Sequence, residues 1–152
     1  MQQNLFTSHL AEIKVSYSSK VKYADMKCIS TSKDAEEIFR SIWSDNMELL
    51  EEFYILILNR ANRVIGWYQV SKGGTSGTVV DPKIIFSVAL RCHACGIILA
   101  HNHPSGNTKP SHQDLELTKK IVSGGKLLEI SVLDHIILSN ETYFSFGDET
   151  LL

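Results

Sequence analysis

The stretch HNHPSGNTKPSHQD, residues 101–114, gathers three histidines and one aspartate within fourteen positions. His101 and His103 stand two residues apart at the end of a short apolar segment, GIILAH (96–101). Because alternate side chains of a β-strand share one face, both imidazoles can converge on one ion. Asp114 would add a carboxylate, which gives the donor set of two nitrogens and one oxygen that catalytic zinc favours, with a fourth position open for water.

The same stretch also has a purely structural interpretation. Ser111 and Asp114 stand three residues apart before an apolar-periodic segment, which is the form of a capping box with Ser111 at the N-cap and Asp114 at N3. Pro104, Gly106 and Pro110 would then simply make a turn. Such a box needs no metal, so this fragment alone leaves a capped loop and a metal site both open.

A second pattern that could bind metal, the CxxC formed by Cys92 and Cys95, is weaker. The sequence contains no second CxxC, and Cys92 continues the apolar face of an expected helix, so both cysteines are predicted to be buried core thiols. Zinc deaminases place H-x-E before P-C-x-x-C, whereas here the cysteines precede the histidines. Three cysteines are also too few for a disulfide framework.

The spacing of the polar residues resembles a known pattern. His101-x-His103, seven intervening residues and Ser111-x-x-Asp114 match the motif of the JAMM (JAB/MPN) metalloenzyme superfamily. The fuller string AHNHPSGNTKPSHQDLELT, together with LDHIIL and YFSF, resembles its RadC-like branch, and the resemblance runs from about AEIKVSY to the final YFSF. It implies one Zn²⁺ per chain, held by His101, His103 and Asp114. It also implies an α/β (mixed α+β) fold of the JAB/MPN type, with a mixed central sheet flanked by helices in a cytidine-deaminase-like layout.

The resemblance further implies a reaction, the hydrolysis of an amide or isopeptide bond in a peptide or isopeptide-linked substrate. The general base of the family is a glutamate ahead of the first long core strand, in a Glu-x-Phe setting, and the matching residue is Glu51 in LEEFYILILN. Glu51 would take a proton from a zinc-activated water and pass it to the leaving amine, while Ser111 would stabilise the oxyanion. Glu52 directly precedes Phe53 and remains a competitor; adjacent residues of a strand point to opposite faces, so the two glutamates cannot share the role.

Two other functions stay open. The RadC-like branch is commonly labelled DNA repair, so the domain could be a non-catalytic DNA-repair-associated or protein-interaction module, although scaffold members of the superfamily typically lack the ligand set present here. A metal-dependent nuclease or phosphodiesterase could use the same ion, but a single zinc lacks the second metal that commonly clamps a phosphoryl displacement. Nucleic acid stays among the candidate partners, yet a formal net charge of −2 provides no basic footprint for it.

Asp134 and His135, which precede an apolar run, have two interpretations. They could support the metal ligands, since ligating imidazoles usually donate their other N–H to a carboxylate or carbonyl. They could equally form an internally satisfied pair within a strand. The glycine-rich stretch KGGTSG (72–77) lacks the GK[ST] ending of a phosphate loop and is predicted to be a loop that borders the site.

The remaining sequence predicts the elements that must position these residues. Asp81-Pro82 has the form of an N-cap followed by proline at the first helical position. Helices are expected over STSKDAEEIFRSIW with an end near residues 45–46, after Asp81-Pro82, and over LELTKKIVSGGK with an end at Gly124-Gly125. Strands are expected at AEIKVSY (11–17), at a hairpin formed by FYILILN (53–59) and RVIGWYQVS (63–71), at GIILAH (96–101), and in ISVLDHIIL and TYFSF.

The chain of 152 residues has the length of one ordinary domain. Residues 1–152 are predicted to form a single RadC-like JAB/MPN domain, in which residues 1–50 are an N-terminal strand-helix extension without a helix-hairpin-helix domain. The sequence lacks a signal peptide and any run of roughly 18 apolar residues, so a cytoplasmic protein without a membrane partner is expected. The residue pattern predicts no particular oligomeric state.

Overall fold

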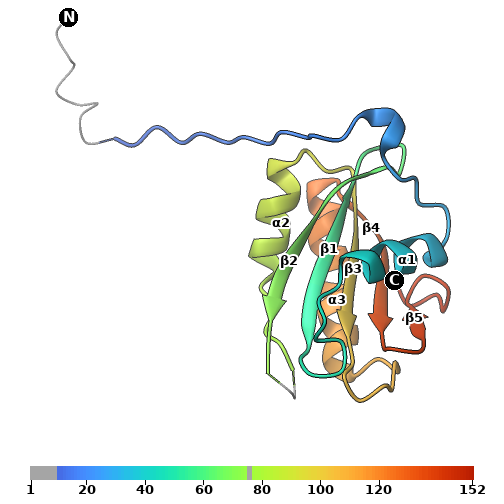
Figure 1. Ribbon diagram of the computed structural model, residues 1–152. Coiled ribbons are helices and arrows are strands. Elements are labelled where there is room, and N and C mark those ends of the chain that lie inside the picture. Colours follow the sequence, from blue (N-terminus) through green and yellow to red (C-terminus); the bar gives the residue numbers. More distant parts are fainter. Residues whose placement is uncertain (1–9, 75–76) are drawn as a thin grey trace, which may run out of the picture.

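A five-stranded mixed sheet lies between helices in the computed structural model, which describes residues 10–74 and 77–152 (Figure 1). The strands are β1 (Glu52–Leu58), β2 (Val64–Lys72), β3 (Gly96–Asn102), β4 (Ser131–Leu138) and β5 (Tyr143–Ser145). The helices are α1 (Ser32–Ile42), α2 (Pro82–Arg91) and α3 (His112–Leu128), and a 3-10 turn, η2 (Tyr23–Asp25), precedes them. None of the helices in the described ranges is long and apolar enough to cross a membrane.

The strand order is β2-β1-β3-β4-β5. Strands β3 and β4 are parallel, because helix α3 carries the chain back between them, and the other neighbouring pairs are antiparallel. The predicted hairpin of β1 and β2 is confirmed, and β1 is buried along its whole length between β2 and β3. The mixed α/β fold expected from the sequence is therefore confirmed.

The sheet is covered on both faces, with α1 on one side and α2 and α3 on the other (Figure 1). Even-numbered residues of β1 pack on the α1 side, and odd-numbered residues pack on the side of α2 and α3. The α1 side contains Ala35 and Phe39 against Tyr54, Leu56 and Leu58. The opposite side contains Ile85, Ala89 and Ile121 against Phe53, Ile55 and Ile57. This alternation decides which polar residues at the strand ends share a side of the sheet.

Each α-helix begins with a side chain that accepts a hydrogen bond from one of the free backbone N–H groups of its first turn. Helices α1 and α3 both begin with a capping box, formed by Thr31 with Asp34 and by Ser111 with Asp114. Helix α2 begins with Asp81 as the N-cap and proline in its first turn, as predicted. The capping interpretation of Ser111 and Asp114 is thus confirmed, and it does not exclude a second role for either residue.

The prediction of a strand at residues 11–17 is wrong. This segment has no strand in the structure, and its apolar side chains are exposed, Ile13 by 87% and Val15 by 62%. Its contact with the sheet is a hydrogen bond that the Tyr17 hydroxyl donates to the Ile65 carbonyl at 2.9 Å. Alternation provides an apolar face, but a strand is stabilised by hydrogen-bonded and side-chain contacts with a neighbouring strand, which this segment does not make.

Two predicted helix ends are also wrong. Helix α1 ends at Ile42 rather than near residues 45–46, and α3 continues past Gly124-Gly125 to Leu128, where Glu129 adopts a left-handed conformation. A Cβ on Gly125 would lie 2.4 Å from the carbonyl oxygen of Ile130. Glycine is needed at position 125 because the chain that leaves the helix packs against it. The glycine pair therefore does not mark the end of α3.

The prediction of two buried core thiols is confirmed in part for Cys92 and is wrong for Cys95. Cys92 is partly buried and packs against the core on the side of α2 and α3, whereas Cys95 is exposed. Helix α2 ends at Arg91, so the apolar helical face does not continue as far as Cys95.

Candidate functional site

The two histidines and the aspartate of the predicted ligand set lie together at one end of the sheet. One candidate ligand atom from each of His101, His103 and Asp114 falls within 4.8 Å of the others. His101 lies near the end of β3, His103 follows that strand, and Asp114 lies in the first turn of α3. The fold thus brings the end of β3 close to the start of α3, although His103 and Asp114 are eleven positions apart in the sequence.

The spacing of the donor atoms suits a tetrahedral ion. Nε2 of His101 lies 3.0 Å from Nε2 of His103 and 3.2 Å from Oδ1 of Asp114, and Nε2 of His103 lies 3.4 Å from Oδ2 of Asp114. Donor atoms that each lie about 2.0–2.2 Å from a tetrahedral zinc are about 3.3–3.6 Å apart. The three residues therefore fit a zinc ion with little rearrangement, and their two imidazoles and one carboxylate are a donor set typical of catalytic zinc.

The second nitrogen of each histidine ring is bound within the protein. Nδ1 of His103 lies 2.7 Å from the Asn107 carbonyl oxygen, which accepts only, so the proton of a neutral ring is on Nδ1. Nδ1 of His101 lies 2.8 Å from Nε2 of His135. These contacts orient both rings so that their Nε2 atoms face Asp114.

The Asp114 carboxylate and the His103 ring favour each other's charged forms. Partial burial by itself would raise the pKa of Asp114, but the adjacent His101 and His103, which donate to it only when they carry a proton on Nε2, and the backbone N–H of Ser111 hold that pKa well below its ordinary value. Burial lowers the pKa of His103, yet the Asp114 carboxylate and the Asn107 carbonyl outweigh that effect and raise it. Protons and a metal ion would therefore compete for the same atoms.

Glu51 lines one pocket, of about 330 Å³, with His101, His103, Ser111 and Asp114. All five predicted site residues are thus on the same side of the sheet. Burial raises the pKa of the Glu51 carboxyl above its ordinary value, although the two imidazoles oppose the shift. The glycine-rich stretch (72–77) was predicted to border the site, and its last residue, Gly77, and the next residue, Thr78, both line this pocket.

Ser111 engages Asp114 by both its backbone and its side chain. Its N–H and its hydroxyl each donate to Oδ2 of Asp114 at 2.7 Å, and its Oγ accepts from the Asp114 N–H at 3.1 Å. The serine therefore fixes the rotamer of the carboxylate while it caps the helix.

Glu52, the competitor of Glu51, points to the opposite face of the sheet. Its side chain is fully buried and contacts Ser44 at 2.6 Å, Gln69 at 3.2 Å and Lys72 at 3.6 Å. The separation follows from the alternation of side chains along the chain that enters β1. The carboxylate beside the histidines is therefore that of Glu51.

Asn102, between the two histidines, was not among the predicted site residues. It is fully buried on the α1 side, where its amide donates to the carbonyls of Met47 and Leu50, both at 2.8 Å. Its Oδ1 accepts the backbone N–H of Glu52 at 2.8 Å. The residue at the centre of the H-x-H pattern thus holds the backbone on both sides of Glu51. The signal in the sequence was the alternation of side chains along a strand, which puts a polar Asn102 on the face opposite the histidines.

The two open interpretations of Asp134 and His135 each apply to one residue. Asp134 is satisfied internally, because its carboxylate accepts from the His135 N–H, the Ser145 hydroxyl and the Gly147 N–H. The His135 side chain instead contacts His101 and, through Nδ1, the hydroxyl of Thr118 at 2.6 Å. Thr118 was missed in the sequence; its signal was a position one helical turn beyond Asp114.

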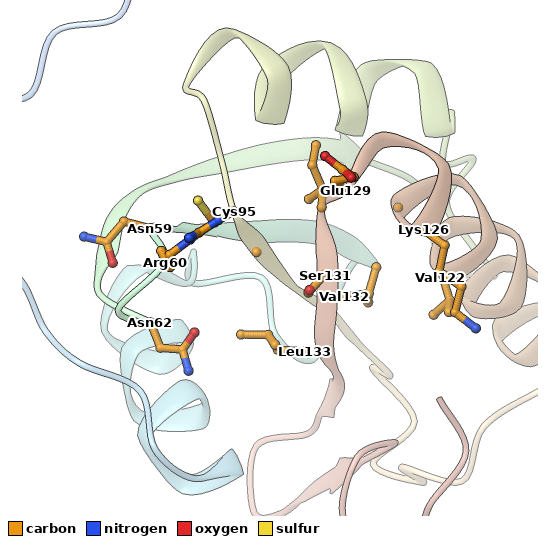
Figure 2. Close-up of a pocket in the computed structure, with 13 residues that line it drawn as sticks. Asn59, Arg60, Asn62, Cys95, Val122, Lys126, Glu129, Ser131, Val132 and Leu133 are labelled. Carbon is orange, nitrogen blue, oxygen red and sulfur yellow. The ribbon is translucent and has the colours of Figure 1, made fainter.

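A larger pocket, of about 720 Å³, lies at the other end of β3, where the strand begins at Gly96 (Figure 2). Its polar lining includes Arg60, Lys126 and Glu129. It contains none of the five predicted site residues and none of the His/Asp cluster identified in the described parts of the chain. The larger of these two pockets is therefore not the one that contains the His/Asp cluster.

Comparison with known proteins agrees with this geometry. Residues 29–151 match the RadC-like JAB domain. A UPF0758 protein of Flavobacterium johnsoniae is 45% identical over 124 residues, which cover 82% of this chain and 53% of the relative. UPF0758 proteins of Chlorobaculum parvum and Alkaliphilus metalliredigens are 41% and 33% identical over 69% and 91% of this chain, and 47% and 58% of their own lengths. The chain thus spans about half the length of these relatives. The match over most of the sequence shows that the chain belongs to the RadC-like JAB domain family.

Proposed function

We propose that this domain is a zinc-dependent hydrolase of the JAMM type that cleaves an amide or isopeptide bond, with Glu51 as the general base. The observation that carries the proposal is the convergence of two imidazoles, one carboxylate and a partly buried glutamate on one pocket. His101, His103 and Asp114 would hold the zinc. A bound zinc would supply Lewis acidity and lower the pKa of a coordinated water to about 7.

The residues of this chain provide the other parts of the reaction. Among the residues that line the pocket, Glu51 has the carboxylate that is not in the ligand set, which supports the proposal that it accepts a proton and returns it to the leaving amine. Its raised pKa brings the carboxyl closer to neutral pH, which favours such a transfer. Both the N–H and the hydroxyl of Ser111 donate to the Asp114 carboxylate, so the hydroxyl, which lines the pocket, could turn its one proton to a developing oxyanion while the N–H keeps its bond.

The first test is metal content in the purified protein. We expect about one zinc per chain, and we expect its loss in Asp114→Asn. Asp34→Asn is a matched control, because Asp34 occupies the same N3 position of a capping box in α1. Loss of zinc in Asp114→Asn alone supports the ligand role; equal zinc in both variants contradicts it.

The second test separates the two adjacent glutamates. Glu51→Gln is expected to retain zinc and to lose turnover by about a hundredfold or more, the typical contribution of a general base. Glu52→Gln changes a carboxylate on the other side of the sheet and should retain most turnover. Full activity in Glu51→Gln would exclude it as the base.

The substrate class is tested by parallel assays with an isopeptide-linked substrate and with labelled DNA, each with and without chelator. Cleavage of the isopeptide that stops with chelator is the expected result. Chelator-sensitive cleavage of DNA alone would support a nuclease, and zinc-loaded protein that cleaves neither would favour a scaffold.

A further inference from the structure

A buried chain of hydrogen bonds connects the predicted zinc ligand His101 to the backbone of the predicted ligand Asp114. Nδ1 of His101 lies 2.8 Å from Nε2 of His135, and Nδ1 of His135 lies 2.6 Å from Oγ1 of Thr118. Oγ1 of Thr118 in turn lies 2.6 Å from the carbonyl oxygen of Asp114. The side chains are almost inaccessible to solvent: His101 is 2% exposed, Thr118 1% and His135 not at all.

The donor and the acceptor of each of these hydrogen bonds follow from the one at α3. A backbone carbonyl only accepts, so the Thr118 hydroxyl donates its single proton to Asp114. Thr118 must then accept at its contact with His135, so the proton of His135 is on Nδ1. A neutral imidazole has one N–H, so Nε2 of His135 accepts and Nδ1 of His101 donates.

The surroundings of His135 hold its ring in place. The ring stacks on Phe146 with centroids 4.7 Å apart and an interplanar angle of 17°, and Phe53 lies 5.5 Å away. Such an apolar, fully buried position favours the neutral form of the ring. Phe53 also stacks on His101 at 5.9 Å with an angle of 3°, so both imidazoles have restricted orientations.

We propose that His135 is a positioning residue that, together with Thr118, fixes His101 as the tautomer with a free lone pair on Nε2. That nitrogen is the atom that faces His103 and Asp114. The inference rests on the proposed zinc site, which it deepens. It assigns an imidazole, in place of a carboxylate, as the acceptor for the second N–H of a metal-binding histidine.

The Asp114 carboxylate works against this tautomer when no ion is bound. Its Oδ1 lies 3.2 Å from Nε2 of His101 and would favour a proton on that atom. Asp114→Ala removes the competing carboxylate but leaves the backbone carbonyl that ends the chain. In metal-free Asp114→Ala the buried hydrogen bonds therefore compete for the His101 proton with Nε2 of His103, 3.0 Å from Nε2 of His101, and no longer with the carboxylate.

The direct test is nitrogen NMR of the imidazoles in metal-free Asp114→Ala at pH 8. We expect His101 and His135 each to carry the proton on Nδ1, and we expect His101 to become a mixture of tautomers when Thr118→Val is added. A proton on Nε2 of His101 in metal-free Asp114→Ala would overturn the proposal. Because this protein contains no metal and is assayed without substrate, the result does not depend on hydrolase activity.

The second test is zinc affinity, measured by competition with a chelator in the otherwise unchanged chain. Thr118→Val and His135→Leu are each expected to weaken zinc binding by about 10–100-fold, the usual effect of removing a partner of a metal ligand. His135→Gln, whose side-chain oxygen can still accept from His101, should recover part of the loss. Thr78→Val is the matched control, because Thr78 lines the pocket but its hydroxyl bonds to Ser71.

The two possible failures are distinguishable. Absence of zinc binding by the unchanged chain would contradict the proposed function, whereas the tautomer measurement would still support or overturn the role of His135. Unchanged zinc affinity in both Thr118→Val and His135→Leu, with a folded core by circular dichroism, would overturn the positioning role while the zinc site stands.

Discussion

The side-chain oxygen of Asn102 accepts the backbone N–H of Glu52 at 2.8 Å and so ties the end of β3 to the start of β1. The same side chain binds the carbonyls of Met47 and Leu50. The segment that carries Glu51 is therefore held from the face of the sheet opposite the histidines. The His101 and His103 side chains therefore lie with Asp114 on one face of the sheet, while Asn102 between them holds the segment of Glu51 from the other face.

Asn102→Ala should destabilise the domain more than an ordinary polar truncation. It would leave two carbonyls and one N–H without their partner, and an unsatisfied buried group costs about 1–3 kcal/mol. We expect a loss of about 3 kcal/mol in the free energy of unfolding, measured by urea denaturation. Asn140→Ala, at an exposed position, is the control; similar values for the two variants would contradict the prediction.

The two capping boxes give a matched pair of substitutions. Thr31→Ala and Ser111→Ala each remove an N-cap side chain and should each lower stability by about 1 kcal/mol. Because Ser111 also lines the site pocket, only Ser111→Ala should reduce turnover, by about a hundredfold, in the isopeptide assay. A comparable loss of turnover in Thr31→Ala would show that helix stability, and not the hydroxyl, is responsible.

Stability should depend on pH through Glu36, which is buried in α1 and ion-paired with Lys33 and Arg40. Burial opposes ionisation, but the hydrogen bonds and charges of those two residues lower the pKa of Glu36 below its ordinary value of 4.5. For an acid with a lowered pKa, the stabilisation is complete above the unfolded pKa and is lost as the pH falls through the folded pKa.

Glu36→Gln should therefore cost about 1–3 kcal/mol at pH 7, and the difference from the unchanged protein should shrink as the pH falls below about 4.5. Thermal unfolding from pH 7 to pH 3 measures this difference. Glu37→Gln, at an exposed position of the same helix, should show neither effect. A difference that is constant across the range would refute the assignment.

Gly125→Ala should be destabilising although alanine favours helices by about 1 kcal/mol over glycine. The new Cβ would lie 2.4 Å from the Ile130 carbonyl oxygen, and backbone must shift to remove that contact. Such overpacking typically costs about 1–3 kcal/mol. Gly66→Ala introduces a Cβ with no neighbour within 4 Å and should change stability by less than about 0.5 kcal/mol. Denaturant midpoints for the two variants provide the comparison.

Local sequence patterns predicted what short-range geometry determines. Strand alternation indicated that His101 and His103 could converge, and the capping box was also predicted, because each signal spans only a few residues. These local patterns left a capped loop and a metal site both open, and the ligand set with Asp114 came from the resemblance to the JAMM motif. Which of Glu51 and Glu52 lies on the side of the histidines depends on where β1 begins, and the structure shows that it is Glu51. The strand expected at 11–17 failed because its existence depends on a partner elsewhere in the chain.

A supporting role for His135 was one of two interpretations that the sequence left open, but its contacts with His101 and Thr118 could not be predicted locally, for the same reason. His135 stands 34 positions from His101 and 17 from Thr118, and the three meet only because β3 and β4 pair in parallel under α3. A buried polar residue needs a hydrogen-bond partner, but the local sequence does not indicate which residue that partner is. The partner depends on which strands are neighbours in the sheet.

The ligand set draws on two layers of the fold, since the histidines belong to the end of β3 and Asp114 belongs to the start of α3. An ion shared between them would be a cross-link that fastens the helix to the sheet and closes the loop between them. Metal binding would then stabilise the folded domain by about 4 kcal/mol when the free metal concentration is one thousand times the dissociation constant. The first turn of α3 would then exchange its amide protons faster in the metal-free protein, and metal binding would also lengthen the survival of the domain under proteolysis.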